Sequence, residues 1–159
     1  MVDYNLENFF IKIYKNLNSQ DLFYSYSDEK KKYSDCLIFI EKLFFQLEKL
    51  RINKRQSIYI IGDKSFEMYS SIIGVIFKNI TWVPISPNIP PDKLKDIIDS
   101  IKPNLLICDE NEKKLVKFFK KNKCLILSYK QIHKSSKQVL SIQKILKDFN
   151  FNRIAFIYF

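Results

Sequence analysis

Runs of apolar residues alternate with amphipathic stretches through most of the chain. Four runs are apolar at nearly every position, as in parallel strands buried on both faces; they lie near 58–61, 81–85, 105–108 and 125–127. Between them, apolar residues recur three or four positions apart, as on one side of a helix; these stretches cover 65–77, 91–101 and 109–121. The alternation predicts an α/β fold with a mostly parallel sheet and helices on both faces.

The first fifty residues have a different pattern. Helical spacing of apolar residues from Tyr4 to Leu17 predicts an amphipathic helix, and Leu22–Tyr26 is aromatic and β-prone. A polar turn at 28–30 and a returning strand at 31–33 would complete a β-hairpin. A longer helix is expected from Ser34 to Leu50, with Ser34 as its N-cap and Asp35 in its first turn.

We therefore divide the chain into two parts. Residues 1–33 are expected to form a short N-terminal helix and hairpin, and residues 34–159 an α/β subdomain. At about 159 residues the whole is the size of one ordinary domain.

Local signals refine the central elements. Ser65 is placed to cap the helix after the first buried strand, and Asn79 suits the left-handed position where that helix ends. Gly74, inside the same helix, indicates a close packing contact. Pro84 cannot donate to a strand ladder, which indicates either an edge strand or the end of a strand at 81–85. Asp109 and Glu112 have the spacing of a capping box.

The last thirty residues continue the alternation. Residues 128–137 are predicted to be a polar loop that carries the single histidine, His133. The spacing of Val139, Ile142, Ile145 and Leu146 predicts a further helix, and Ile154–Phe159 has a strand pattern.

No residue cluster in this sequence has the pattern of a known catalytic or metal site. With 2 glycines in all, neither a dinucleotide-binding motif nor a P-loop is possible. Asp63-Lys64-Ser65 could bind an anion at a helix N-terminus but has no glycine-rich loop. The pairs Asp96 and Asp99, and Asp109 and Glu110, are better explained as solvated faces or caps. We therefore predict no catalytic, cofactor-binding or metal-binding residue.

The cysteines and the histidine do not change this picture. Cys36, Cys108 and Cys124 are widely spaced and lie in apolar patterns, which favours buried, inert thiols over a disulfide framework or a zinc site. His133 lacks a neighbouring cysteine or carboxylate, so a surface position is expected.

The formal net charge of +10 raises the possibility of a polyanionic partner. The lysines are scattered through every segment, however, and we interpret them as a solvated coat. The longest wholly apolar run, Ile72–Phe77, is far shorter than a membrane span. No secretory signal is visible at the N-terminus, so a cytoplasmic protein is expected.

One long stretch, Ser57 to Leu106, resembles the first core region of the adenylate-forming ligases. The resemblance rests on Trp-Val-Pro-Ile-Ser-Pro at 82–87, then Pro-Pro-Asp-Lys-Leu at 90–94, then the strand Pro-Asn-Leu-Leu-Ile at 103–107. The superfamily includes acyl-CoA synthetases, amino-acid adenylation domains and D-alanine–carrier protein ligases. Ser86 stands where the family usually has Asp, and Asn79 where it has Gly.

The resemblance implies the first α/β subdomain of the ligase large domain. Such a parent enzyme activates an amino acid or acyl acid with ATP and Mg2+ to an acyl-adenylate, then transfers the acyl group to the thiol of CoA or a carrier protein. In that family a strand like Ile154–Phe159 leads into the phosphate-binding loop, which this chain does not contain. No family catalytic residue therefore corresponds to a position here, and we expect the chain alone to be inactive.

Two alternatives stay open. The chain could be a stand-alone α/β binding or scaffold module without catalysis. Its charge also leaves a basic nucleic-acid-binding domain as a less favoured hypothesis.

Overall fold

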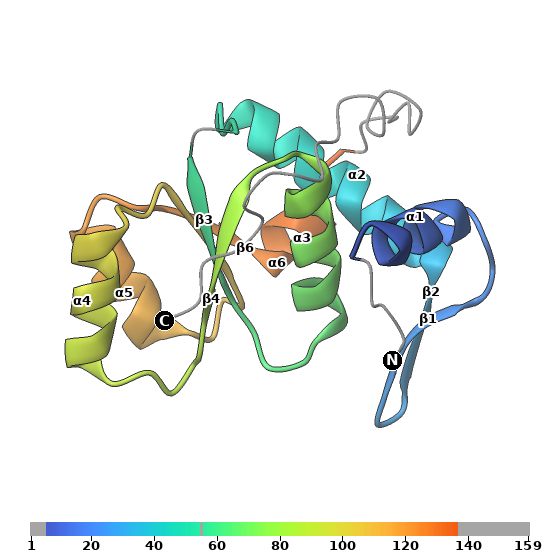
Figure 1. Ribbon diagram of the computed structural model, residues 1–159. Coiled ribbons are helices and arrows are strands. Elements are labelled where there is room, and N and C mark those ends of the chain that lie inside the picture. The colour runs from blue at the N-terminus through green and yellow to red at the C-terminus, as the bar shows by residue number, and fades with distance from the viewer. Residues whose placement is uncertain (1–5, 55, 137–159) are drawn as a thin grey trace, which may run out of the picture.

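The computed structural model describes residues 6–54 and 56–136. An N-terminal part leads into a parallel sheet flanked by helices (Figure 1). The N-terminal part consists of α1 (Leu6–Asn16), the hairpin β1 (Leu22–Tyr26) and β2 (Glu29–Lys32), and α2 (Tyr33–Lys49). The sheet and its helices are β3 (Ser57–Ile61), α3 (Phe66–Phe77), β4 (Thr81–Ile85), α4 (Pro91–Ser100), β5 (Leu105–Cys108), α5 (Lys113–Lys121), β6 (Leu125–Ser128) and α6 (Tyr129–His133).

The four described strands of the main sheet are all parallel and follow the order β4-β3-β5-β6. This confirms the predicted parallel α/β architecture. In this order β4 has a neighbour on one side only, and Pro84 pairs with Ile60 of β3. The missing N–H of Pro84 is therefore tolerated at the edge of the described strands, one of the two positions that the sequence indicated.

Alternate side chains of each strand enter two separate cores, one on each face of the sheet. In β3, Ile58 and Ile60 join the core formed with α2, α3 and α6, whereas Tyr59 and Ile61 join the core formed with α4 and α5. All four are at most 2% exposed. Burial on both faces explains why these strands are apolar at nearly every position.

The helix α3 lies between the sheet and α2, and a glycine brings the two helices close together. A Cβ added to Gly74 would lie 3.0 Å from Cδ2 of Leu43 in α2. That separation is shorter than an ordinary van der Waals contact between carbon atoms. The predicted packing role of Gly74 is confirmed.

Two more of the predicted local signals are confirmed, and a proline lies at the start of α4. The hydroxyl of Ser65 accepts a hydrogen bond from the N–H of Met68 at 3.1 Å and caps α3. Asn79 has a φ of 55°, the left-handed conformation expected where α3 ends. Pro91 occupies the first turn of α4, where its missing N–H costs no helical hydrogen bond.

Two predicted caps are wrong. The N-cap of α2 is Lys32, not Ser34, and the Asp35 carboxylate accepts the Lys32 N–H at 2.9 Å. Asp109 does not cap α5 either, because its carboxylate accepts the N–H of Asn111 at 2.8 Å in a local turn. The N-cap there is Glu112, whose side chain makes no capping hydrogen bond. At α5 the local turn therefore takes the carboxylate that the predicted cap required.

Other boundaries also differ from expectation. The hairpin turn is tighter than predicted, because Glu29 and Lys30 already pair in β2 while Ser27 takes a left-handed φ of 53°. The expected polar loop at 128–137 contains the short helix α6, capped by Ser128 through the N–H of Gln131 at 3.2 Å. In α5, Leu115 and Phe119 are buried and Phe118 is partly buried.

Some predictions lie outside the described residues. They are the helix marked by Val139, Ile142, Ile145 and Leu146 and the strand at Ile154–Phe159. The division of the chain into residues 1–33 and 34–159 stays a prediction. Within the described part of the chain, no helix has both the length and the apolar character needed to span a membrane.

Candidate functional site

The strand order creates a crevice where the chain changes direction across the sheet. From β3 the chain passes through α3 to β4 on one side, and from β4 it crosses by α4 to β5 on the other side. Helix α3 packs on one face, and α4 and α5 pack on the opposite face. In open parallel sheets the carboxyl ends of the strands at such a switch point are the usual ligand site. Here that point lies between β3 and β5.

A cavity of about 590 Å³ opens at this switch point. Gly62 and Asp63 follow β3, Asp109 and Glu110 follow β5, and α6 closes one side. The floor includes Tyr129 of α6, whose hydroxyl donates a buried hydrogen bond of 2.8 Å to the carbonyl of Ile61. Burial raises the pKa of the Tyr129 hydroxyl, so this group stays protonated and holds α6 to the end of β3.

A hydrogen-bonding contact and an ion pair line the walls of the crevice. The Nε2 atom of His133 lies 3.0 Å from Oε1 of Glu67, and Lys130 Nζ lies 2.7 Å from Oε1 of Glu110. The hydrogen bond and the charge of Glu110 raise the pKa of Lys130. Both pairs link α6 to residues more than 19 positions away, so only the fold brings them together.

The charges in the crevice decide what it can bind. Its lining has five carboxylates against two lysines; they are Asp63, Glu67, Asp109, Glu110, Glu112, Lys130 and Lys134. The Ser65 hydroxyl, at the helix N-terminus that could have bound an anion, is already used as the α3 cap. An acidic crevice without a glycine-rich loop does not suit a polyphosphate.

Among residues 6–54 and 56–136, no group of three or more histidine, cysteine or carboxylate side chains is arranged to hold a metal ion. The acidic lining of the crevice does not suit the phosphates of ATP, and the side chains that line it define no catalytic step.

The structure places the other candidate residues as follows. Cys36, Cys108 and Cys124 are all free and buried, as predicted. Burial raises the pKa of each thiol to about 12, which makes all three poor nucleophiles at neutral pH. Asp96 and Asp99 are exposed on α4, as expected of a solvated face.

His133 differs from expectation in part. Its side chain is 47% exposed, as predicted, but it lies in α6 and contacts Glu67 and the ring of Phe39. No local sequence pattern indicates this pair, because Glu67 and His133 are 66 positions apart.

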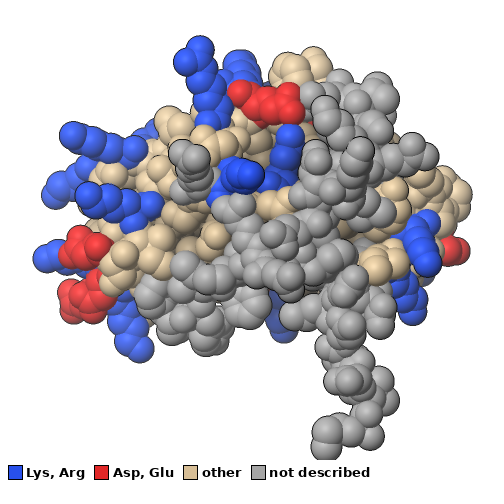
Figure 2. Space-filling view, turned by 45° about the horizontal axis from the view of Figure 1, so that its top comes forward, with Lys and Arg blue, Asp and Glu red and all other residues tan. Residues whose placement is uncertain are grey.

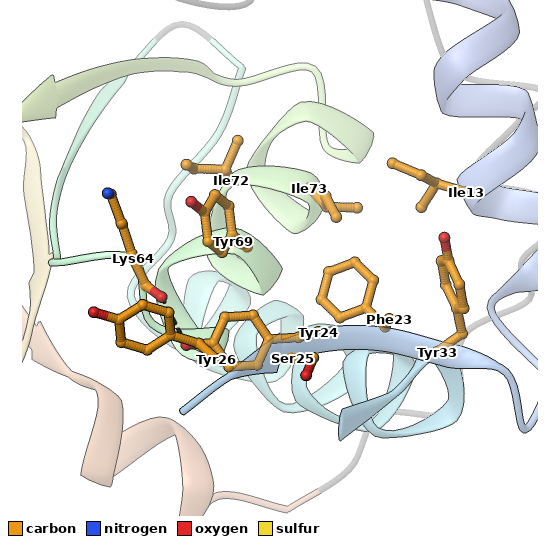
Figure 3. A pocket seen from close by; sticks show the side chains of 10 residues that line it. All are labelled: Ile13, Phe23, Tyr24, Ser25, Tyr26, Tyr33, Lys64, Tyr69, Ile72 and Ile73. Carbon is orange, nitrogen blue, oxygen red and sulfur yellow. Dashed lines mark hydrogen bonds between the residues drawn. The ribbon is translucent and has the colours of Figure 1, made fainter. Parts of the chain in front are cut away.

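A second cavity, of about 500 Å³, was not predicted. It lies between the hairpin and α3, and aromatic side chains point into it from both (Figure 3). Its aromatic lining residues are Phe23, Tyr24, Tyr26, Tyr33 and Tyr69.

Basic side chains are spread over the face of the molecule that Figure 2 shows. On the face shown in Figure 2, Lys and Arg side chains stand in several separate places with Asp and Glu among them. This distribution agrees with a solvated lysine coat.

The sequence has distant relatives among multidomain synthetases. No known family model matches the chain. The hybrid PKS-NRPS synthetase LUC5 of Fusarium sp is 26% identical over 97 residues, which is 61% of this chain and 2% of that protein. The nonribosomal peptide synthetase nlsA of Emericella nidulans is 23% identical over 79 residues, 50% of this chain and 1% of that protein.

Solved structures share the fold over most of the chain. Apo MatB from Rhodopseudomonas palustris matches with a TM-score of 0.74 and 14% identity, over 95% of this chain and 32% of MatB. AB3403, a four-domain nonribosomal peptide synthetase bound to AMP and glycine, matches with a TM-score of 0.70 and 15% identity, over 98% of this chain and 11% of that protein. Fatty acyl-adenylate ligases from E. coli and L. pneumophila give a TM-score of 0.67 at 15% identity, over 83% of this chain and 26% of theirs. The chain thus spans a third or less of these structures.

Proposed function

We propose that this chain, a relative of the adenylate-forming ligases in fold and in part of its sequence, is the first α/β subdomain of an enzyme that activates a carboxylate. The proposed reaction joins the carboxylate of an amino acid or acyl acid to the AMP part of ATP, with Mg2+ and release of pyrophosphate. It then passes the acyl group to the thiol of CoA or a carrier protein and releases AMP. The main support is the joint match of sheet order, N-terminal hairpin and proline-rich exit after β4 to this superfamily.

In this proposal the chain serves as scaffold for chemistry carried out elsewhere. The crevice at β3 and β5 is acidic and has no catalytic set, so we expect the 159 residues alone not to form an acyl-adenylate. The relatives are many times longer, which leaves room for the catalytic parts outside the matched region.

ATP–pyrophosphate exchange tests this proposal. The isolated chain and the complete product of its coding sequence would be assayed against a panel of amino acids, aryl acids and fatty acids. We expect exchange with at least one acid for a complete product that extends past Phe159, and none for the isolated chain. Exchange by the isolated chain would contradict the scaffold role. An extended product that is inactive with every acid would contradict the adenylation function.

A stand-alone binding module is the second candidate, and one observation favours it. Each face of the sheet has its own buried core, completed by helices from within the described residues. A self-sufficient module should unfold cooperatively and stay monodisperse, whereas a dependent subdomain should expose apolar surface and aggregate. Thermal melting with simultaneous light scattering distinguishes the two.

A further inference from the structure

The pocket between the hairpin and α3 is lined by residues from several elements. Ile13 comes from α1, Phe23 and Tyr24 from β1, and Tyr69 and Ile73 from α3 (Figure 3). Its volume of about 500 Å³ falls within the range of small-molecule sites. The pocket is on the hairpin side of α3 and is lined by a different set of residues from the crevice at β3 and β5, with which it shares none.

The aromatic walls are held in place by the protein itself. Phe23 and Tyr24 each contact the ring of Phe66 edge-on, with centroids 6.1 and 6.2 Å apart. The Tyr24 hydroxyl also donates a 2.7 Å hydrogen bond to the carbonyl of Lys64. Rings fixed in this way lose little conformational entropy when a ligand binds.

The rim of the pocket is polar and carries one positive charge. Tyr26 is 60% exposed and Tyr69 is 40% exposed, so their rings border both the pocket and solvent. Lys64 is the single charged residue among the ten that line the pocket, and none of the ten is acidic. A ligand anion would therefore meet an ammonium group without competition from a carboxylate of the lining.

We propose that this pocket binds a planar aromatic anion, such as an aromatic carboxylate. The ring of the ligand would lie among Phe23, Tyr24 and Tyr69, where offset or edge contacts between rings are favourable. Its carboxylate would face the solvent rim near Lys64. The acidic crevice at β3 and β5 would repel the same ligand, so the two cavities select for opposite charge.

This binding site does not depend on the proposed adenylation function. Ligand binding is measured on the chain itself and requires neither ATP nor turnover. Failure of the binding experiment would leave the exchange assay unaffected, and failure of the exchange assay would not affect the pocket.

The first experiment tests the charge. We would titrate the chain with 1-naphthoate and with its uncharged analogue 1-naphthalenemethanol by isothermal calorimetry. Lys64→Gln should weaken naphthoate binding by about 3–5-fold, the effect of one exposed charge, and leave naphthalenemethanol binding unchanged. Lys123→Gln is the matched control, because Lys123 is also exposed and also left-handed, with φ of 59° against 48° at Lys64.

The second experiment tests the aromatic wall. Tyr69→Leu should weaken the binding of both ligands by about 3–10-fold, since it removes one contact between rings. Leu125 is another partly exposed apolar residue and lies in β6, away from the pocket. Leu125→Ala should therefore change the affinity for neither ligand. Circular dichroism checks that each variant is folded.

Three results would overturn the proposal. They are the absence of saturable binding at millimolar naphthoate, an equal loss of naphthoate affinity in Lys64→Gln and Lys123→Gln, and unchanged affinity for both ligands in a folded Tyr69→Leu variant.

Discussion

The two faces of the parallel sheet are covered to different depths. On one face α3 and α6 pack against the strands and α2 packs on both of them, whereas on the other α4 and α5 form a single layer (Figure 1). The helices reflect this difference. α3 is apolar on nearly all sides and buries eight of its 12 residues, whereas α5 buries only Leu115 and Phe119 and carries five lysines.

This comparison indicates where stability and recognition are expected to lie. A helix covered on two sides must be apolar around most of its circumference, and a helix covered on one side needs a single apolar stripe. The thicker face also adjoins the hairpin, so the aromatic pocket and the contact between His133 and Glu67 both occur on its side. Four predictions test the contrast.

The largest expected effect comes from truncating a core leucine on each face. Leu43→Ala in α2 should lower the free energy of unfolding by about 3–5 kcal/mol, because Leu43 is 0% exposed and packs against Gly74. Leu115→Ala in α5 should cost about 2–3 kcal/mol, since its side chain is 8% exposed and the single layer can relax.

Urea denaturation followed by circular dichroism measures both values. Leu125→Ala, at a side chain that is 44% exposed, should change stability by no more than about 0.5 kcal/mol. A loss in Leu115→Ala as large as that in Leu43→Ala would contradict the difference between the faces.

A smaller effect is expected from two buried tyrosine hydroxyls. Tyr129→Phe removes the hydrogen bond to the carbonyl of Ile61 and should cost about 1–2 kcal/mol. Tyr59→Phe removes a 2.6 Å hydrogen bond to the carbonyl of Ile101 and should cost less, about 1 kcal/mol, because that bond is only partly buried. The same urea titration measures the loss of unfolding free energy in each variant. A larger loss in Tyr59→Phe than in Tyr129→Phe would contradict the role of Tyr129 in holding α6.

The helix starts on the two faces should also differ. Ser65→Ala removes the cap of α3 and should destabilise the chain by about 1 kcal/mol. Glu112→Ala at the N-cap of α5 should have almost no effect, because its side chain makes no capping hydrogen bond. Thermal unfolding of the two variants measures this difference. An equal shift of Tm in both would contradict this assignment of caps.

The smallest effect is the pH dependence of stability caused by the three buried thiols, which is absent near neutral pH. Burial raises the pKa of Cys36, Cys108 and Cys124 to about 12 from an ordinary value of 9.0. As the pH rises, the thiols of the unfolded chain lose their protons before those of the folded chain. The contribution of these thiols to the free energy of unfolding should therefore be constant below about pH 9 and fall between pH 9 and pH 12. Urea midpoints at pH 8 and pH 10 measure the fall, which should be smaller in Cys36→Ala. An identical fall in that variant would show that the Cys36 thiol does not contribute.

Much of the local structure could be predicted from the sequence. The apolar runs form buried strands in the structure. Ser65 caps the start of α3 and Asn79 takes the left-handed conformation after its end, as expected. The helix α6 was missed, because only Tyr129 and Ile132 of its five residues are buried. Its position depends on α2 and on the end of β3, which a local pattern does not contain.

The chain by itself determined the class of fold, the positions of most helices and strands and the inert burial of its thiols. These follow from periodicity and side-chain preference within a few neighbouring residues. Only the tertiary structure decided the strand order, and with it the acidic crevice between β3 and β5. It also brought Tyr24, Lys64 and Tyr69 around one aromatic pocket. Contacts between residues 40 or more positions apart arise from packing of whole elements, which no sequence window records.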